Sequence, residues 1–339
     1  MKVGFVAPLG IALVNGGVRT QALQTASALN KLGVEVEFIS PWQEGIEVDL
    51  VHIFVAGPDT IGIISRCLEL GIKTVLSPVF FSNRSAASIS FSLKAEKVLS
   101  KIGSGIRSDF GIKAEACSIA DFILPNTNAE AELIEKGFGI SPAKIEVIPN
   151  GVELRFANAT PDLFALNYGL KDFVLFVGQA GARRKNVIKL LESAPDVEAP
   201  ILIIGSLFDD EYGERCKQLG RKAGNVTFIE TLDHNSDLLA SAYAACHTFV
   251  LPSQYETPGI AAMEAALAGA NIAITEIGGT KDYFGEWADY LNPKSSKSIA
   301  KAVNNALNKE KSESLKNHIL KNYSWDIVGE KTLKAYNKL

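Results

Sequence analysis

The chain has 339 residues, of which 47% are hydrophobic, 21% charged and 8% aromatic. This composition is typical of a globular protein and excludes disordered, collagen-like and coiled-coil chains. The formal net charge of −4 lacks the basic excess of nucleic-acid-binding proteins, so no nucleic-acid partner is expected. The sequence starts on an apolar strand pattern without a charged leader and has no apolar run long enough to cross a membrane, so we expect a cytoplasmic protein.

Short runs rich in Val, Ile and Phe alternate with helical patterns through the first half of the chain, as is typical of a parallel sheet flanked by helices. Strands are predicted at 2–9, 34–40, 49–55, 73–80, 121–126 and 144–150. Between the first two strands, apolar residues recur at helical spacing over about 18–32, and Gly33 follows where a helix often ends. Residues 1–153 are therefore predicted to form a Rossmann-like domain.

The second half repeats the alternation after a break. Residues 151–171 are polar, contain proline and lack a sustained period, so we interpret them as a linker. Strands are then predicted at 173–178, 201–205, 226–231, 248–253 and 271–275. This predicts a second Rossmann-like domain over 170–310, followed by Lys-rich helices at 311–339 that cross back to the first domain. The predicted fold class is α/β, with two doubly wound domains.

Ligands of open α/β sheets bind beyond the carboxyl ends of the strands, so the loops there are the candidate sites. In the loop after the first strand, Gly16 and Gly17 open a helix, and adjacent glycines let backbone N–H groups approach an anion. The alternative is an ordinary tight turn. The G-x-G-x-x-G pattern is missing, as is an acidic residue after the second strand, which argues against a dinucleotide site.

The loop after strand 173–178 contains three consecutive cations, Arg183, Arg184 and Lys185, just before a helix. A helix N-terminus favours negative charge, so cations placed there destabilise the helix unless an anion neutralises them. We therefore predict that this loop binds an anion such as a diphosphate. The alternative is a solvated basic turn.

The loop after strand 248–253 carries Glu256, and a helix opened by Pro258 and Gly259 carries Glu264. On a helical wheel Glu264 falls at the edge of the buried face, where a carboxylate needs hydrogen-bond donors. The helix rises ~9 Å from Pro258 to Glu264, so the two glutamates can contact opposite ends of one ligand. The helix N-terminus would then lie beside an anionic group in the middle of that ligand. A sugar, a diphosphate and a ribose, joined in that order, have hydroxyl groups at both ends and negative charge between them.

Glu256 and Glu264, with residues 257–260 directly after the first, resemble the E-x(7)-E motif of retaining glycosyltransferase family 4, which has the GT-B fold. Further similar segments follow the family order: the Gly-Gly loop, ADFILPNTNAEAELIEKGF, KIEVIPNGVE, NVTFIETL, VLPS, IGGTKDYFG and YSWD. The resemblance extends over nearly the whole chain. It implies two Rossmann-like domains that face each other across a cleft.

The resemblance also implies an activity. It implies a retaining glycosyltransferase that moves a hexose from a UDP- or GDP-sugar to a glycan or lipid-linked acceptor in envelope or secreted polysaccharide synthesis. The implied donor contacts are Glu256 with the backbone of Thr257, Pro258, Gly259 and Ile260 for the hexose, Glu264 for the ribose, Lys185 for the diphosphate, and Gly16 and Gly17 for the sugar phosphate.

No D-x-D triplet is present in the sequence, so we expect no metal and no cofactor besides the nucleotide sugar as co-substrate. Instead, Lys185, Arg184 and the helix N-terminus at Gly259 are expected to stabilise the charge that develops on the departing diphosphate. Glu256, Lys185 and Arg184 are thus the candidate catalytic residues.

The chain departs from the family pattern at two places. Gln179 stands where the family usually has Arg, so Arg183 or Arg184 is expected to supply that charge. Ser77 and its neighbours stand where a His is common. None of the four histidines fills that place, and each is assigned to a structural or surface position: His52, His234, His247 and His318. Two alternatives stay open, a sugar-nucleotide 2-epimerase of the same fold and a non-catalytic partner that binds sugar nucleotides, which Gln179 and Ser77 favour.

Basic and apolar residues alternate in the segment 89–113. Its cations are Lys94, Lys97, Lys101, Arg107 and Lys113. A basic amphipathic stretch can lie on an anionic membrane surface, which would place the protein at the inner membrane face. The alternative is a helix packed in the first domain with a solvated basic face.

Overall fold

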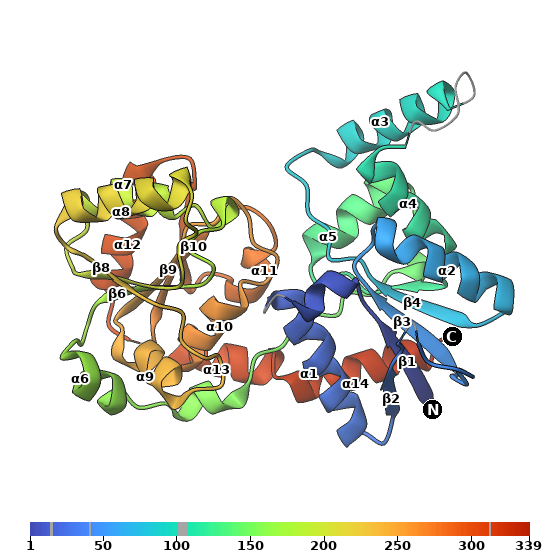
Figure 1. Ribbon diagram of the computed structural model, residues 1–339, viewed down its shortest axis with the longest axis horizontal. Helices are drawn as coiled ribbons and strands as arrows, with labels where there is room; N and C mark the ends of the chain where they lie inside the picture. The colour runs from blue at the N-terminus through green and yellow to red at the C-terminus, as the bar shows by residue number, and fades with distance from the viewer. Residues whose placement is uncertain (14–15, 41, 101–106, 312) are drawn as a thin grey trace. The chain divides into compact units, whose positions relative to one another are not determined.

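The computed structural model describes residues 1–13, 16–40, 42–100, 107–311 and 313–339. The chain divides into two compact units, each with one sheet covered by helices (Figure 1). Unit 1 comprises Met1–Gly151 and Trp325–Leu339, and unit 2 comprises Val152–Ser324.

The sheet of unit 1 is parallel, with strand order β2-β1-β3-β4-β5. Its strands are β1 (Lys2–Val6), β2 (Glu35–Phe38), β3 (Leu50–Phe54), β4 (Lys73–Ser77) and β5 (Phe122–Ile123). Its helices are α1 (Gly17–Lys31), α2 (Pro58–Leu70), α3 (Ala86–Leu99), α4 (Asp109–Ile119), α5 (Asn128–Glu132), α14 (Trp325–Tyr336), the π-helical turn η2 (Leu133–Gly137) and the 3-10 turns η1 (Leu9–Ala12) and η3 (Pro142–Lys144). Every residue of β3 is buried, as expected for a strand covered on both faces.

Two separate groups of helices cover the unit 1 sheet. Helices α1 and α14 lie side by side and share one apolar cluster with β1, whereas α2 and α4 pack in a second cluster (Figure 1). The side chain of His52 in β3 ties α14 to the sheet, because its Nδ1 lies 2.6 Å from the Tyr336 hydroxyl and its Nε2 lies 2.9 Å from Ser77 Oγ. Burial lowers the pKa of His52 to about 3, so the ring is neutral. Ser77, which belongs to the stretch expected in place of a family histidine, thus has a structural role in unit 1.

The sheet of unit 2 is also parallel, with strand order β11-β10-β9-β6-β7-β8. Its strands are β6 (Val174–Val177), β7 (Ile201–Ile204), β8 (Val226–Ile229), β9 (Thr248–Leu251), β10 (Asn271–Thr275) and β11 (Ala288–Leu291). Its helices are α6 (Asp162–Tyr168), α7 (Val187–Ser193), α8 (Glu211–Ala223), α9 (Asp237–Ala245), α10 (Ile260–Leu267), α11 (Thr280–Phe284), α12 (Ser296–Leu307) and α13 (Glu313–Asn322), with 3-10 turns η4 (Leu154–Asn158), η5 (Arg183–Lys185) and η6 (Ala194–Asp196). Figure 1 shows α7, α8 and α12 on one face of this sheet and α9, α10 and α13 on the other.

The predicted fold class, two Rossmann-like parallel-sheet domains, is confirmed. The segment predicted as a linker instead belongs to unit 2, because Phe156 and Phe164 are completely buried in its core. Of the helices predicted at 311–339 to return to the first domain, α14 does so and buries Tyr336 in unit 1, whereas α13 buries Ile319 in unit 2. The predicted strand 144–150 forms an isolated bridge, from Ile145 to Ile123, and donates backbone hydrogen bonds to Ile123 O and Pro125 O.

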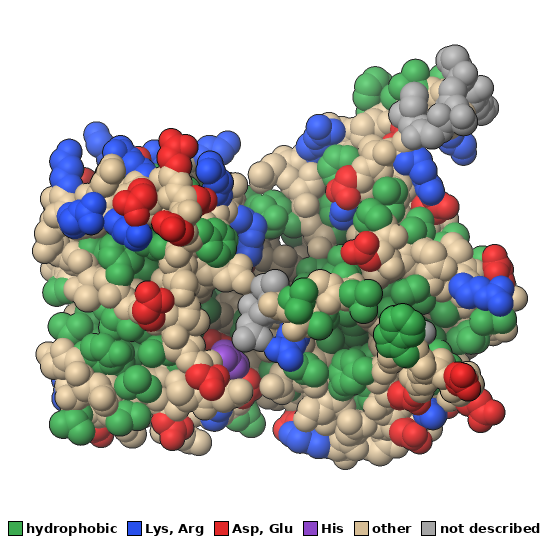
Figure 2. All heavy atoms as spheres, in the orientation of Figure 1, with side chains coloured by type: hydrophobic (Ala, Val, Ile, Leu, Met, Phe, Trp, Pro, Cys, Tyr) green, Lys and Arg blue, Asp and Glu red, His purple; other side chains and the backbone are tan. Residues whose placement is uncertain are grey.

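Helix α3 exposes part of its apolar surface. The side chains of Phe91, Val98 and Leu99 are 76%, 60% and 48% exposed, and Figure 2 shows hydrophobic and basic side chains together over this region. Lys101, from the predicted basic stretch, lies outside the described residues. No helix among the described residues is both long and apolar enough to cross a membrane.

Candidate functional site

Glu256 lies in the loop between β9 and α10, beyond the carboxyl end of β9. Its side chain is buried, and its Oε1 accepts hydrogen bonds from Lys185 Nζ at 2.6 Å and from Ser253 Oγ at 2.6 Å. Arg184 Nη1 lies 3.3 Å from the same oxygen. The structure thus brings together the three residues predicted to be catalytic, although Lys185 and Glu256 are 71 positions apart in the chain.

The electrostatics of this cluster favour an ionised carboxylate. Burial alone would raise the pKa of Glu256, but the charges of Lys185 and Arg184 and the hydrogen bonds from Lys185 and Ser253 outweigh it, and the pKa lies below its ordinary value. The carboxylate therefore holds the lysine in place at neutral pH. Lys185 Nζ has three N–H donors, so it can contact Glu256 and a further acceptor at once.

The backbone of Glu256 is held by the loop after β10. Glu256 N–H donates to Ile277 O at 3.1 Å, and Gly279 N–H donates to Glu256 O at 2.9 Å. Gly278, between them, has φ of 107°, and a Cβ there would lie 1.9 Å from Glu256 O. Only glycine combines this conformation with this close approach.

The three predicted cations do not share one partner. Arg183 lies over the ring of Tyr212. Arg184 lies over Tyr255 and donates to its carbonyl at 2.9 Å, besides its ion pair with Glu256. Lys185 makes the shorter ion pair with Glu256, at 2.6 Å.

The cations also do not begin the following helix. They form the turn η5, and α7 starts only after Asn186, whose φ is 60°. The side-chain amide of Asn186 donates to the carbonyls of Pro252 and Pro293 and so pins the turn. Glu256 pairs with Lys185, so a carboxylate of the chain itself offsets part of the charge of the triplet, and the diphosphate contact stays a prediction.

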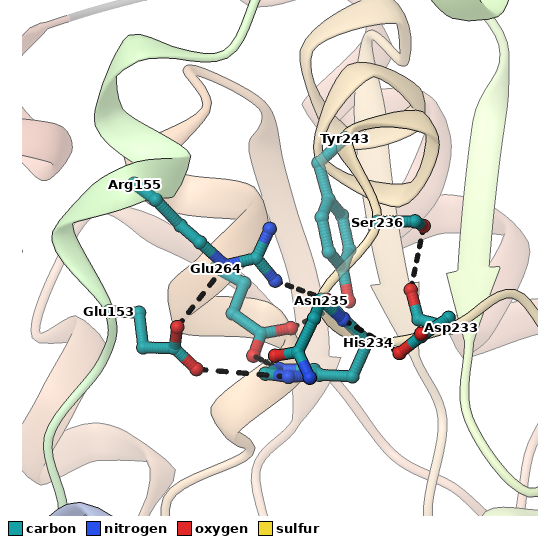
Figure 3. Close-up of polar contacts among 8 residues, drawn as sticks. All are labelled: Glu153, Arg155, Asp233, His234, Asn235, Ser236, Tyr243 and Glu264. Carbon is teal, nitrogen blue, oxygen red and sulfur yellow. Dashed lines mark hydrogen bonds and ion pairs between the residues drawn. The ribbon is translucent and has the colours of Figure 1, made fainter.

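Glu264 lies in α10 and is 4% exposed. Its Oε2 accepts a hydrogen bond from the Tyr243 hydroxyl at 2.8 Å, and its Oε1 lies 2.8 Å from His234 Nε2. These are the donors that its predicted position at the buried face requires. Figure 3 shows the tyrosine ring and the imidazole converging on the carboxylate from α9 and from the loop after β8.

The residues between the two glutamates form the start of α10. Thr257 and Pro258 precede the helix, and Gly259 caps it with φ of 71°. The helix runs from Ile260, so its N-terminus lies between Glu256 and Glu264 along the chain. The first N–H groups of a helix have no partner within it, and they can bind an anion.

The remaining predicted contact, the Gly16-Gly17 pair, lies in unit 1. Gly16 caps the N-terminus of α1 with extended backbone, and α1 begins at Gly17. The two residues before them in the predicted loop, 14 and 15, lie outside the described residues. Gln179, at the first departure from the family pattern, lies exposed in the turn after β6.

Sequence reasoning missed several residues around Glu264. His234 was assigned to a structural or surface position, yet it contacts Glu264, and its Nδ1 lies 3.7 Å from Glu153 Oε1 (Figure 3). Arg155 donates to the backbone carbonyl of His234 and, through Nε, to Glu153 Oε2 at 3.2 Å. The available signal was the place of His234, in a polar loop after a predicted strand.

Metal ligands do not cluster in the described part of the chain. Within those ranges, no group of three or more His, Cys, Asp and Glu side chains surrounds a point that could hold a metal ion.

Solved structures share the fold over the full chain. The sucrose-phosphate synthase of Thermosynechococcus elongatus aligns with a TM-score of 0.76 at 15% identity, over 99% of this chain and 98% of that one. Alr3699/HepE of Anabaena, in complex with UDP and glucose, aligns with a TM-score of 0.73 at 15% identity, over 100% of both chains. The two Rossmann-like units therefore form a GT-B fold.

Two family models match the chain, one for most of each unit. The model for glycosyl transferases group 1 matches residues 165–324, and the model for glycosyltransferase family 4 matches residues 42–156. The chain belongs to the family 4 glycosyltransferases of the GT-B type.

Curated relatives carry glycosyltransferase names. The uncharacterized glycosyltransferase MJ1607 of Methanocaldococcus jannaschii is 27% identical over 219 residues, 59% of this chain and 55% of the relative. The D-inositol 3-phosphate glycosyltransferase of Paenarthrobacter aurescens is 26% identical over 178 residues, 46% of this chain and 41% of the relative. The chain thus spans about half the length of the curated relatives it matches.

Proposed function

We propose that the protein is a retaining glycosyltransferase that transfers a hexose from a nucleoside diphosphate sugar to a glycan or lipid-linked acceptor, without a metal ion or other cofactor. The observation that carries the proposal is the ion-paired cluster of Glu256, Lys185 and Arg184 beside the N-terminus of α10. It lies beyond the carboxyl ends of β6 and β9, where open α/β sheets bind ligands.

The cluster suits a donor with a diphosphate centre. Breaking the bond between sugar and phosphate leaves negative charge on the departing diphosphate, and fixed cations and helix N–H groups lower the barrier by stabilising that charge. Lys185, Arg184 and the first turn of α10 supply both kinds of group. Glu256 then holds Lys185 and accepts hydrogen bonds from the hexose.

Glu264 suits the ribose. Each of its carboxylate oxygens already interacts with one protein group, and each oxygen has a second lone pair for a ribose hydroxyl. The complexes of HepE with UDP and with UDP-glucose favour a UDP-sugar as the donor of this chain. Envelope or secreted polysaccharide synthesis is the pathway we propose for it.

The decisive experiment measures donor binding by calorimetry and donor turnover by product analysis, with UDP- and GDP-sugars and pooled acceptors. Lys185→Met should weaken nucleoside diphosphate binding by about tenfold or more, because it removes a charge-assisted hydrogen bond to phosphate. Lys189→Met is the matched control, since Lys189 pairs with Glu192 on the surface of α7. Unchanged diphosphate affinity in Lys185→Met would refute the proposed phosphate site.

Product analysis separates the proposed activity from its alternatives. A glycosylated product with the donor's anomeric configuration supports a retaining transferase. An epimerised donor would identify a 2-epimerase, and tight binding without turnover would identify a non-catalytic partner. An inverted anomeric configuration would contradict the proposed stereochemistry while leaving the donor site intact.

A lipid-linked acceptor would require contact with a membrane surface, which we propose for α3. Its exposed Phe91, Val98 and Leu99 lie on the same helix as Lys94 and Lys97, and an apolar face with basic residues binds anionic lipid surfaces. Vesicle flotation should recover the protein with anionic but not with neutral vesicles, and Phe91→Ser with Val98→Ser should abolish this. Equal recovery of the double variant would exclude α3 as the contact.

A further inference from the structure

His234 lies between two carboxylates that come from separate elements. Its Nε2 is 2.8 Å from Glu264 Oε1, and its Nδ1 is 3.7 Å from Glu153 Oε1 (Figure 3). Its side chain is 41% exposed, so the ring can exchange a proton with solvent, whereas the Glu264 side chain is 5% exposed. A titratable group therefore contacts a buried carboxylate of the proposed donor site.

The groups that face the imidazole come from three elements. Glu264 lies in α10, Arg155 and the Phe156 ring belong to η4, and Glu153 immediately precedes η4. Tyr243, from α9, shares the Glu264 carboxylate with the ring. Asp233, the preceding residue, instead accepts a hydrogen bond from Asn235 N–H within their own loop.

The number of protons on the ring decides how many carboxylates it can bind. A neutral imidazole has one N–H donor and one acceptor nitrogen, so it can donate to Glu264 or to Glu153, and its lone pair then faces the other carboxylate. A protonated imidazole has two N–H donors and attracts both. Only the protonated ring links α10 to the residue before η4 through a charge-assisted hydrogen bond to Glu264 and an ion pair with Glu153.

We propose that His234 is a positioning residue whose protonated form fixes the Glu264 carboxylate for the ribose of the donor, so that pH controls donor affinity. This inference rests on the proposed role of Glu264 toward the nucleotide. Affinity is high while His234 is protonated and falls as the pH rises through its pKa, because the neutral ring repels one of the two carboxylates.

The electrostatic surroundings of His234 raise its pKa above the ordinary value for histidine. The hydrogen bond to Glu264 and the charges of Glu264 and Glu153 raise the pKa of His234, and together they outweigh the opposing effects of partial burial and of Arg155. The protonated form is therefore more populated near neutral pH than for a solvent-exposed histidine.

The test is calorimetric binding of a nucleoside diphosphate sugar from about pH 6 to 8.5. The intact sugar nucleotide is the probe because it lacks the terminal phosphate that titrates near pH 6. Wild-type affinity should fall by about tenfold across this range, the effect of one charge-assisted hydrogen bond. In His234→Gln, where the amide can donate to Glu264 but cannot titrate, affinity should stay constant across the range.

Two further variants sharpen the assignment. Glu153→Gln removes one carboxylate that favours the protonated ring, so the midpoint of the affinity change should move to lower pH. His247→Gln is the matched control, since His247 is a partly exposed histidine of unit 2 that contacts Thr248 instead of the cluster. It should keep the wild-type profile.

The outcomes separate this inference from the proposed function. If Glu264→Gln binds donor as tightly as the wild type, the proposed nucleotide site itself is wrong. If Glu264→Gln weakens binding but the wild-type affinity does not vary with pH, the role of His234 is wrong and the site stands. Loss of affinity by the same factor at every pH in His234→Gln would reduce His234 to a packing role and overturn the proposal.

Discussion

Each sheet has a buried glutamate near the carboxyl ends of its strands, and the surroundings shift the pKa values of the two glutamates in opposite directions. In unit 2, Glu256 is surrounded by Lys185 and Arg184, which lower its pKa against the effect of burial. In unit 1, Glu130 is equally buried, but no lysine or arginine among the described residues lowers its pKa, and burial raises that pKa to about 7. The comparison shows that burial favours the neutral carboxyl unless cations are built in beside it.

The two glutamates also differ in their hydrogen-bond partners. The oxygens of Glu130 accept hydrogen bonds from Phe80 N–H at 2.6 Å and Asn126 N–H at 2.8 Å, so they join the backbone after β4 to the backbone after β5. Glu256 instead holds the charged end of Lys185. Unit 2 therefore holds an ionised glutamate together with cations, whereas the glutamate of unit 1 fixes two loops of the backbone.

The largest expected effect is on catalysis and tests the charged side of the comparison. Glu256→Gln keeps the side-chain shape but removes the charge that holds Lys185, so kcat/KM for transfer should fall by about 100- to 1,000-fold. Glu214→Gln, which breaks a surface pair with Lys217, should leave transfer unchanged. Wild-type rates in Glu256→Gln would show that the charged cluster is structural, like Glu130.

The next effect is on stability. It tests whether the backbone at Glu256 is held by the close approach of Gly278. Gly278→Ala would place a Cβ on Glu256 O, and we expect it to lower the free energy of unfolding by about 4 kcal/mol or more. Gly224→Ala is the control: its φ of 77° is also positive, but the space around it is open, so about 1 kcal/mol is expected. Urea denaturation measures both, and equal losses would contradict the close contact.

The sequence was sufficient to identify the two loops that carry the charged cluster of unit 2. Strand-end loops of a parallel sheet share one edge, so the strand pattern placed Lys185 and Glu256 at the same edge. Their direct contact depends on the pairing of β6 with β9, which the pattern did not predict. The partners of Glu264 could not, because tertiary packing of α9 and of the loop after β8 brings Tyr243 and His234 to it. Helical periodicity showed only that Glu264 needed donors.

The predicted linker and the predicted grouping of the last helices were wrong for a similar reason. The polar composition of 151–171 predicted a linker, but one apolar side chain per turn, such as Phe156 or Phe164, is enough to anchor a short helix in a core. The final helices shared one Lys-rich composition, and only the positions of Ile319 and Tyr336 in separate cores distinguish them.

A smaller effect, on the pH dependence of stability, tests whether Glu130 of unit 1 is neutral. The pKa of Glu130 is about 7 in the folded chain against an ordinary 4.5, so between these values the unfolded chain loses its proton first. The free energy of unfolding should therefore fall as the pH rises through this window, by up to about 3 kcal/mol. In Glu130→Gln this component of the pH dependence should vanish, whereas Glu132→Gln, on the surface of α5, should retain it. Identical pH profiles for Glu130→Gln and the wild type would mean that Glu130 is ionised in the folded chain, as Glu256 is.

The smallest expected effect comes from His52, also in unit 1. Its contribution to the free energy of unfolding changes with pH in the opposite direction to that of Glu130. Its pKa is about 3 in the folded chain against an ordinary 6.5, so the unfolded chain takes up a proton first as the pH falls. The stabilising contribution of the neutral ring is complete above pH 6.5 and is lost on acidification, by about 2 kcal/mol between pH 6.5 and pH 5.

In His52→Gln this loss should vanish, so its unfolding free energy relative to wild type should rise as the pH falls. Tyr336→Phe removes a hydrogen bond to the ring but leaves it buried, so it should lower stability at every pH and retain the slope. Urea denaturation at a series of pH values distinguishes the two variants. Parallel profiles for His52→Gln and the wild type would mean that His52 takes up a proton as readily in the folded as in the unfolded chain, so that burial does not keep the ring neutral.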